Sequence, residues 1–226
     1  MYLAIDTSTG TAGIAIVAEG EILAELNWRC GQNHSTQLLP RLSDLLTETG
    51  LKIQSAQGII VAKGPGSYNG LRVGISTAKG LAFSLDVPII GISTLSATAY
   101  AHAASGFQVC PVLDARRGEI AAAIYQQKNR KWQRIVTEHI TTVENLCSQI
   151  TTTTIFCGEH IPVIASYLKK QLGGNVIIPS PAARMRRAAF LAELGISRLE
   201  KSDCDNPATL QPTYLRGPAI TKAKHF

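Results

Sequence analysis

The strongest constraint on the fold is that one order of predicted elements occurs twice along the 226 residues. In each half, three short apolar segments typical of strands come first, and helix-like and strand-like segments then alternate. Both halves therefore follow the order βββαβαβα. Their first strands also end alike, in Ile5-Asp6-Thr7-Ser8 and in Leu113-Asp114-Ala115-Arg116. The repeat predicts a duplicated α/β fold with a cleft between the two copies.

The first copy is expected over residues 1–105. Leucines at helical spacing predict a helix over 34–49, because they form one wide apolar stripe. Two more helices are expected at Arg72–Leu85 and Thr94–Ser105. The strand-like segments of this copy are Tyr2–Asp6, Ala12–Ala18, Glu21–Trp28, Gly58–Ala62 and Pro88–Ile92.

The second copy is expected over residues 106–226 in a degenerate form, and its final segment is a candidate to pack back on the first copy. Thr141-Thr142-Val143-Glu144 is a capping-box signal for a helix that ends near Ile150. Further helices are expected at Ile161–Gln171 and Ala182–Glu200. The strand-like segments are Val109–Leu113, Glu119–Tyr125, Trp132–Ile140, Thr153–Phe156 and Val176–Ile178.

Composition indicates an ordinary globular protein, with 45% hydrophobic and 17% charged residues. No apolar run approaches the ~20 residues that a membrane-spanning helix needs. No basic, apolar leader opens the chain. The five cysteines are scattered and odd in number, which argues against a disulfide framework. We therefore expect a cytosolic protein without membrane contact.

The net charge of +6 is concentrated in the second half of the chain. Residues 106–226 contain sixteen Lys and Arg against nine Asp and Glu, whereas residues 1–105 contain six against seven. A basic half is a candidate surface for RNA. The alternative is a solvated surface without a partner. If RNA is contacted, the candidates are Arg184, Arg186 and Arg187.

The duplicated pattern resembles the actin-like superfamily, which is built from two ribonuclease-H-like domains. In that superfamily an acidic residue at the end of each first strand lies beside the phosphates and metal of ATP, where carboxylates suit Mg²⁺. The resemblance makes Asp6, Ser8 and Asp114 candidates for a vestigial nucleotide site. The alternative is that each aspartate only caps its own turn.

Several motifs narrow the resemblance to the TsaB (YeaZ) family. They are Ile5-Asp6-Thr7-Ser8, His34-Ser35, the glycine-containing block from Gly64 to Gly74, Asp114-Ala115-Arg116-Arg117-Gly118-Glu119 and Pro212-Thr213-Tyr214-Leu215-Arg216. The resemblance implies a subunit of the machinery that transfers threonylcarbamoyl to the tRNA adenosine next to the anticodon. Its implied partners are the catalytic paralogue TsaD, the ATPase TsaE and, through the complex, tRNA.

The resemblance further implies a scaffold and not an enzyme on its own. The paralogue carries a His-x-x-x-His metal pair, but His34 is followed at that spacing by Leu38. Arg116 and Arg117 are too bulky for a phosphate beside Asp114. We therefore expect no catalytic residue, no metal and no cofactor. The alternatives are a free-standing ATP-dependent small-molecule kinase of the same superfamily and, disfavoured for lack of paired ligands, a metalloprotease.

The glycine block from Gly64 to Gly74 matches neither a Gly-x-Gly-x-x-Gly loop nor a Walker loop, so we expect it to form a sharp turn. The family resemblance implies that the helices at 34–49 and 72–85 pair with TsaD or, in a homodimer, with a second copy. The alternative is that their small and apolar residues face their own sheet. The interface candidates are Leu38, Leu42, Leu45, Gly74, Ala78 and Ala82.

Overall fold

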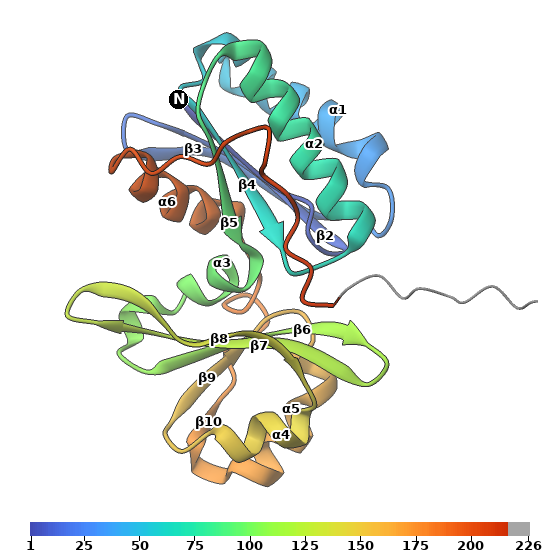
Figure 1. Ribbon diagram of the computed structural model, residues 1–226, viewed down its shortest axis with the longest axis vertical. Coiled ribbons are helices and arrows are strands. Elements are labelled where there is room, and N and C mark those ends of the chain that lie inside the picture. Colours follow the sequence, from blue (N-terminus) through green and yellow to red (C-terminus); the bar gives the residue numbers. More distant parts are fainter. Residues whose placement is uncertain (217–226) are drawn as a thin grey trace, which may run out of the picture.

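The computed structural model describes residues 1–216, and residues 217–226 of the second expected copy lie outside the described residues. Two five-stranded sheets lie one beyond the other along the long axis, each with helices packed against it (Figure 1). The waist between the sheets contains the loops that follow their first strands.

The first sheet has the strand order β3-β2-β1-β4-β5. β1 pairs antiparallel with β2 and parallel with β4, so the sheet is mixed. Its centre is fully buried because runs such as Ile59-Ile60-Val61 are apolar on both faces. The strands are β1 (Tyr2–Asp6), β2 (Thr11–Ala18), β3 (Glu21–Arg29), β4 (Gly58–Gly64) and β5 (Ile89–Ser93).

The second sheet repeats that arrangement, with the order β10-β9-β6-β7-β8. β6 pairs antiparallel with β7 and parallel with β9, as β1 does with β2 and β4. The predicted fold class, α/β with two ribonuclease-H-like units, is confirmed. The strands are β6 (Gln108–Arg116), β7 (Glu119–Lys128), β8 (Lys131–Thr141), β9 (Thr154–Cys157) and β10 (Val176–Ile177).

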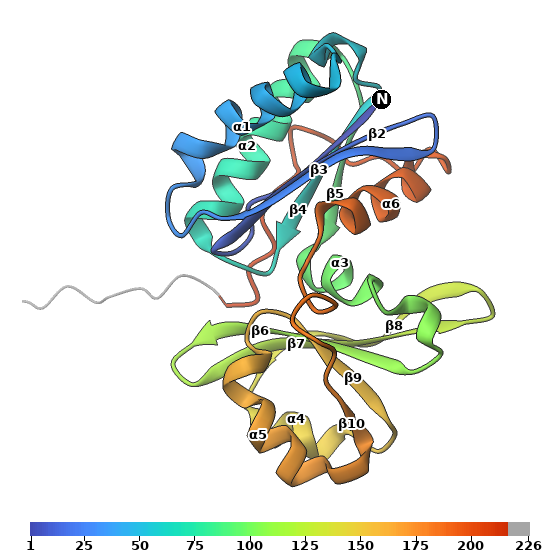
Figure 2. The same cartoon turned by 180° about the vertical axis from the view of Figure 1, so that it is seen from behind.

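Two helices cover one face of each sheet. α1 (His34–Thr49) and α2 (Tyr68–Leu85) pack on the first, while α4 (Val143–Gln149) and α5 (Ile161–Leu172) pack on the second (Figures 1 and 2). Leu38, Leu42 and Leu45 of α1 are buried against the first sheet, whereas Leu39 is exposed. Burying each such leucine stabilises the fold by roughly 1.5–3 kcal/mol. The apolar spacing therefore determines which side of each helix faces inward.

The last helix of each copy lies at the waist. α3 (Thr94–Tyr100) contributes Ala97 to the core of the first sheet and Leu95 and Ala99 to the core of the second. α6 (Ala188–Leu199) packs on the remaining face of the first sheet, where a Cβ at Gly195 would lie 2.5 Å from Ile60. We propose that the units are residues 1–105 and 106–226, with α6 closing the first sheet.

α6 begins six residues later than the sequence-predicted helix over 182–200, so that boundary was wrong. Residues 181–184 form turns, and Arg187 has extended backbone dihedrals, with φ −121° and ψ 138°. The cause is tertiary, because contacts to other segments hold the side chains of Arg186 and Arg187. These contacts keep the backbone extended up to the first residue of α6.

The segment after α6 returns along the first sheet. The backbone N–H of Asp205 donates to the carbonyl of Ile89, and that of Thr213 donates to the carbonyl of Lys63. Leu210 is buried in the first core. Short 3-10 turns lie at Ile53–Ser55, Ala103–Ser105 and Gly173–Asn175. Within residues 1–216, no helix combines the length and the apolar character needed to span a membrane.

Candidate functional site

Asp6 ends β1 and accepts two hydrogen bonds from its own turn. The backbone N–H of Ser8 donates to Oδ1 of Asp6 at 2.9 Å, and Oγ of Ser8 donates to the same oxygen at 2.6 Å. Both residues are buried. Short aspartate side chains often close such turns. One oxygen of the Asp6 carboxylate is therefore fully engaged within the loop.

The other oxygen of Asp6 is held by a guanidinium from a distant part of the chain. Nε of Arg186 donates to Oδ2 of Asp6 at 2.5 Å, and Nη1 donates to Oε1 of Glu159 at 3.1 Å. Nη2 donates to Oγ1 of Thr9 at 2.9 Å and to the carbonyl of Thr11 at 3.0 Å. The Arg186 side chain is only 3% exposed. It joins the first sheet to the second unit at the waist.

The charge of this cluster is fixed by its carboxylates. Burial lowers the pKa of Arg186, but the attraction of Asp6 and Glu159 outweighs burial and holds that pKa above its ordinary value. The guanidinium therefore stays charged and neutralises Asp6. Mg²⁺ bound directly to Asp6 would have to displace Arg186, because the remaining oxygen of the carboxylate is already engaged by Ser8.

Asp114 lies two residues before the end of β6, the first strand of the second unit, and accepts a similar hydrogen bond. The backbone N–H of Arg116 donates to Oδ1 of Asp114 at 2.8 Å, and Nη1 of Arg116 lies 3.5 Å from Oδ2. Arg116 and Arg117 both have left-handed backbones, with φ of 68° and 57°. Asp114 is exposed and lines a cavity of about 510 Å³ at the waist. Both aspartates thus cap their turns. An arginine lies beside each one: exposed Arg116 beside Asp114, and buried Arg186 beside Asp6.

His34 is a structural part of the same region. Its side chain is buried, and Nε2 lies 2.6 Å from the carbonyl oxygen of Thr9, so a protonated Nε2 donates to that carbonyl. Leu38, four residues on, is buried in the first core. The one imidazole therefore anchors the loop between β1 and β2 and has no neighbouring ligand on its helix.

The glycine block allows α2 to start directly against that loop. A Cβ at Gly66 would lie 2.0 Å from the carbonyl oxygen of Ser8, and one at Gly70 would lie 2.1 Å from that of Thr7. The N–H of Ser67 donates to the carbonyl of Ser8 at 2.6 Å. Gly64 has a φ of 106°, which only glycine adopts readily. The block therefore serves backbone packing, in agreement with the predicted sharp turn.

The predicted partner-contact residues lie on the inner side of the two helices. All six are buried, and the ridge with Ala78 faces the first sheet. They cannot contact a partner while the fold is intact, so this choice of residues is corrected. The sequence pattern could not tell the inner ridge of α2 from the outer one, because both carry small residues. The residues concerned are Leu38, Leu42, Leu45, Gly74, Ala78 and Ala82.

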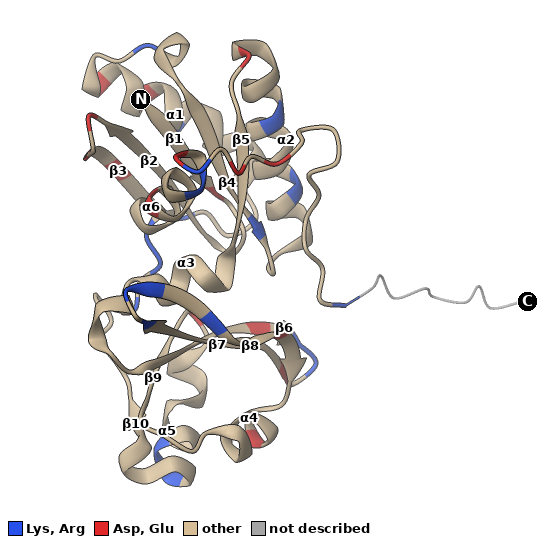
Figure 3. Ribbon diagram, turned by 60° about the vertical axis from the view of Figure 1, so that its left-hand side comes forward, with Lys and Arg blue, Asp and Glu red and all other residues tan. Residues whose placement is uncertain are grey.

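The predicted RNA-contact arginines have three different environments. Arg186 is buried in the carboxylate cluster and cannot reach a phosphate, which corrects that choice. Arg187 is half-exposed and pairs with Glu25 at 2.5 Å. Arg184 forms no ion pair within the described residues. In Figure 3 the basic segment before α6 and the basic turn between β6 and β7 are separate.

Known proteins resemble the chain over nearly its whole length. The family model described as TsaD, tRNA N6-adenosine threonylcarbamoyltransferase, matches residues 29–224. The tRNA threonylcarbamoyladenosine biosynthesis protein TsaB of Bacillus subtilis is 34% identical over 95% of this chain and 93% of its own length. The chain belongs to the TsaB family. The Haemophilus influenzae TsaB is 29% identical, with 97% of this chain and 95% of that relative covered.

A solved structure supports the same fold. YeaZ from Pseudomonas aeruginosa superposes with a TM-score of 0.79 at 23% identity, covering 95% of this chain and 99% of that one. The family recognised from the sequence motifs is thereby confirmed, as is its fold. The match to the TsaD model over the same residues relates the TsaB family to the transferase family.

Sequence reasoning missed one feature of this TsaB-family chain. Arg186 forms ion pairs with both Asp6 and Glu159. Glu159 stands alone in the sequence, 27 residues before Arg186 and 153 after Asp6. The one signal in the sequence that pointed to this contact was the reduced phosphate site. If Asp6 no longer holds a cation, its carboxylate needs another positively charged partner. A search for a basic residue to match Asp6 still could not choose among many arginines.

We expect no stoichiometric metal in the purified protein. Among the described residues, no three His, Cys, Asp or Glu side chains are grouped so that they could hold an ion. His34 and Asp6 are engaged by protein groups. Elemental analysis of dialysed protein should find below about 0.1 equivalents of zinc or iron. One full equivalent of either metal would contradict this expectation.

Proposed function

We propose that this chain is a non-catalytic scaffold subunit in tRNA threonylcarbamoyladenosine biosynthesis. In this role it supports TsaD, together with TsaE, in transferring threonylcarbamoyl to the adenosine next to the anticodon. The observation that carries the proposal is the ion pair between Arg186 and Asp6. In an actin-like enzyme the carboxylate at the position of Asp6 would hold the metal of ATP. Here the chain's own Arg186 neutralises it.

No feature of the described residues favours the two alternatives. A free-standing kinase of the actin-like superfamily needs its strand-end carboxylates near phosphate and metal, but Asp6 is buried under Arg186. A metalloprotease needs a group of metal ligands, which residues 1–216 do not offer. We therefore keep the scaffold role as the single proposal.

The outer side of α2 is the surface that we propose for TsaD. Phe83 is 87% exposed, which is unusual for a large aromatic side chain. Ser76 and Gly80 lie on the same outer side and are also exposed. Small residues beside an exposed aromatic ring allow the backbone of a partner to approach and the ring to bury itself in a pocket. The inner ridge with Ala78 serves the fold instead.

The first test removes or obstructs this surface. Phe83→Ala is expected to weaken TsaD binding about 30-fold or more, since a buried aromatic anchor contributes ~2 kcal/mol or more to an interface. Ser76→Trp is expected to prevent close approach. Both variants should melt within about 2 °C of the unchanged protein because neither side chain is buried. Co-purification with TsaD and isothermal titration measure the loss.

Matched variants lie on α5 in the other unit. Val163→Ala shortens a side chain that is 75% exposed, and Ser166→Trp enlarges an exposed serine. Both should bind TsaD normally. If Phe83→Ala and Ser76→Trp also bind TsaD normally, the partner surface lies elsewhere. If the unchanged chain neither binds TsaD nor raises threonylcarbamoyladenosine formation by TsaD and TsaE, the scaffold role itself is refuted.

We further propose that isolated chains form a homodimer through the same outer side of α2. TsaD and a second copy would then compete for one surface, so adding TsaD should dissociate the dimer. The proposal also includes a cytosolic location without membrane contact, and access to tRNA through the complex.

A further inference from the structure

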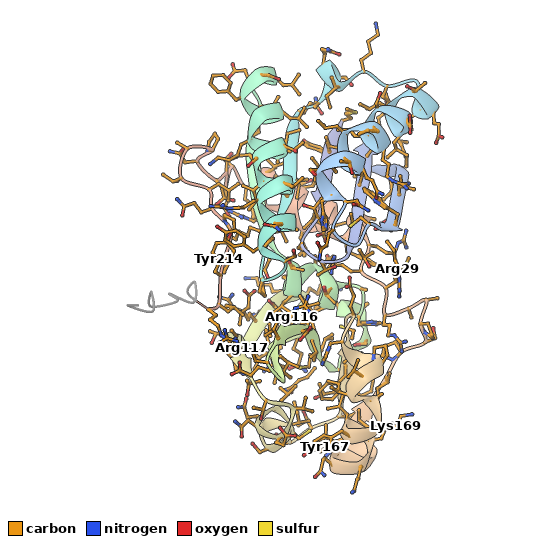
Figure 4. All side chains as sticks on the ribbon, turned by 90° about the vertical axis from the view of Figure 1, so that its right-hand side faces the viewer. Arg29, Arg116, Arg117, Tyr167, Lys169 and Tyr214 are labelled. Carbon is orange, nitrogen blue, oxygen red and sulfur yellow. The ribbon has the colours of Figure 1, made fainter. Side chains whose placement is uncertain are left out.

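Two adjoining cavities at the waist of the molecule together form what we call the groove. One cavity of about 630 Å³ and another of about 510 Å³ share Gly10 and Glu159 in their walls. Together they exceed the ~300–1,000 Å³ of an ordinary small-molecule site. Figure 4 is viewed toward this face. Arg29 lies at the right of the waist, and the labels of Arg116, Arg117 and Tyr214 lie further to the left.

The groove carries positive charge that is not neutralised within it. Its walls contain four arginines against two carboxylates, Glu159 and Asp114. Arg186 is shared between Glu159 and the buried Asp6, and Arg116 lies close to Asp114, so the four arginines exceed the three carboxylates by one charge. The arginines left over, Arg29 and Arg184, form no ion pair among residues 1–216. Unpaired arginines along a groove attract phosphates.

Tyr68 lines the other end of the groove, and Tyr214, which stacks on it, lines an adjoining cavity of about 130 Å³. The rings of Tyr68 and Tyr214 are 5.4 Å apart at an interplanar angle of 26° and are about half exposed. The guanidinium of Arg72 lies 4.5 Å from the ring centre of Tyr68. Tyr68 therefore contacts both Arg72 and Tyr214, and among the described residues the ring of Tyr214 remains 41% exposed. Such a ring stacks on a nucleobase of any identity.

We propose that this groove binds single-stranded RNA, in the form of unpaired loop nucleotides of the tRNA that the complex modifies. Phosphates would contact Arg29 and Arg184, and one unstacked base would lie on Tyr214. The inference rests on the proposed function and specifies its RNA surface. A mononucleotide fits less well, because Arg29 and Arg184 line one cavity and Tyr68 lines the other, and because Arg186 takes the position of a metal at Asp6. Recognition of unpaired bases by stacking is the usual mode for RNA loops.

The test measures binding of an unmodified tRNA transcript to the complex of this chain with TsaD at several salt concentrations. Arg29→Gln with Arg184→Gln should weaken binding at least about a hundredfold at physiological salt, as two charge-assisted hydrogen bonds are lost. The slope of log affinity against log salt should become shallower by about 0.7–0.9 per arginine. Tyr214→Ala should weaken binding at least about fivefold, whereas Tyr214→Phe should not.

The matched control is Arg130→Gln with Lys131→Gln, which removes the same charge from the exposed turn between β7 and β8. This turn lies at the far end of β7 from Arg117, about 30 Å away along ten strand residues. The control should keep both affinity and slope. If both pairs lower the slope equally, binding follows net charge alone and the groove proposal is wrong.

Two further outcomes separate this proposal from the proposed function. The unchanged chain and each variant are first tested for TsaD binding. If the unchanged chain does not bind TsaD, the scaffold role is refuted and the groove proposal is not. If TsaD binds every variant and tRNA affinity stays unchanged in all of them, the groove does not contact RNA. Full competition of tRNA by ATP, or binding of a protein in its place, would assign the groove to that ligand.

Discussion

Replacing Arg186 with alanine is expected to lower the free energy of unfolding by about 3–5 kcal/mol, because it leaves Asp6 buried with an uncompensated charge. At ~2–4 °C per kcal/mol for a chain of this size, the melting temperature should fall by about 10 °C. The loss is large because four hydrogen bonds, two of them also ion pairs, end at one side chain. Calorimetry or urea denaturation of the purified chain measures it.

The nearby Arg184→Ala is the control for this change, since Arg184 has no ion pair within the described part of the chain. It should alter stability by no more than ~0.5 kcal/mol. Adding Asp6→Asn to Arg186→Ala should restore part of the loss, because the unpaired charge is then gone. Magnesium should raise the melting temperature of Arg186→Ala more than that of the unchanged chain. An Arg186→Ala protein that melts within about 2 °C of the unchanged chain would show that the ion pair does not stabilise the waist.

Two glycines of α2 are expected to respond oppositely to the same substitution. Gly70→Ala should destabilise the fold by about 3 kcal/mol or more, because its Cβ would lie 2.1 Å from the backbone oxygen of Thr7 and 3.1 Å from Nε2 of His34. Neither the oxygen nor the start of α2 can move without opening the contact between helix and loop. Melting curves of the two alanine variants, recorded side by side, measure the difference.

Gly80→Ala is the matched control, ten residues further along the same helix. A Cβ at Gly80 meets no atom of its own chain within 4 Å, so alanine there should stabilise the monomer by roughly 0.5–1 kcal/mol through helix propensity, measured at a concentration too low for the proposed homodimer. Equal stability of the two variants would mean that the close approach at Gly70 relaxes freely. A destabilised Gly80→Ala would mean that the outer side of α2 is already packed against something in the isolated protein, such as a second copy.

The fold was largely predictable because its signals are local. The spacing of the leucines predicted a helix over 34–49, and the structure has α1 at His34–Thr49. The matching ends of the first strands indicated the duplication, and both sheets have the same strand order. The start of α6 was not predictable, because side-chain contacts of Arg186 and Arg187 outweigh the helical tendency of residues 182–187.

The candidate site was predictable in kind but not in detail. Sequence reasoning placed Asp6 and Asp114 at strand ends; Asp6 ends β1, whereas β6 continues two residues past Asp114, and both carboxylates accept a backbone N–H two residues further on. The assignment of Arg186 to an RNA surface was wrong, because charge alone cannot distinguish an arginine that faces solvent from one that neutralises a buried carboxylate. The sequence also could not show that Ala78 faces inward, because the outer side of α2 carries residues as small as those of the ridge with Ala78.

The amino-acid sequence by itself determined the family, the duplicated α/β order and the absence of a His-x-x-x-His pair at His34. These follow from spacing along the chain, which sets the helical and strand faces without reference to distant segments. The tertiary structure alone decided which side of α2 is open, where α6 packs and what neutralises Asp6. The position of α6 and the partner of Asp6 depend on residues more than 100 positions apart, and the open side of α2 depends on which ridge meets the first sheet. Such long-range contacts leave no periodic trace in one sequence.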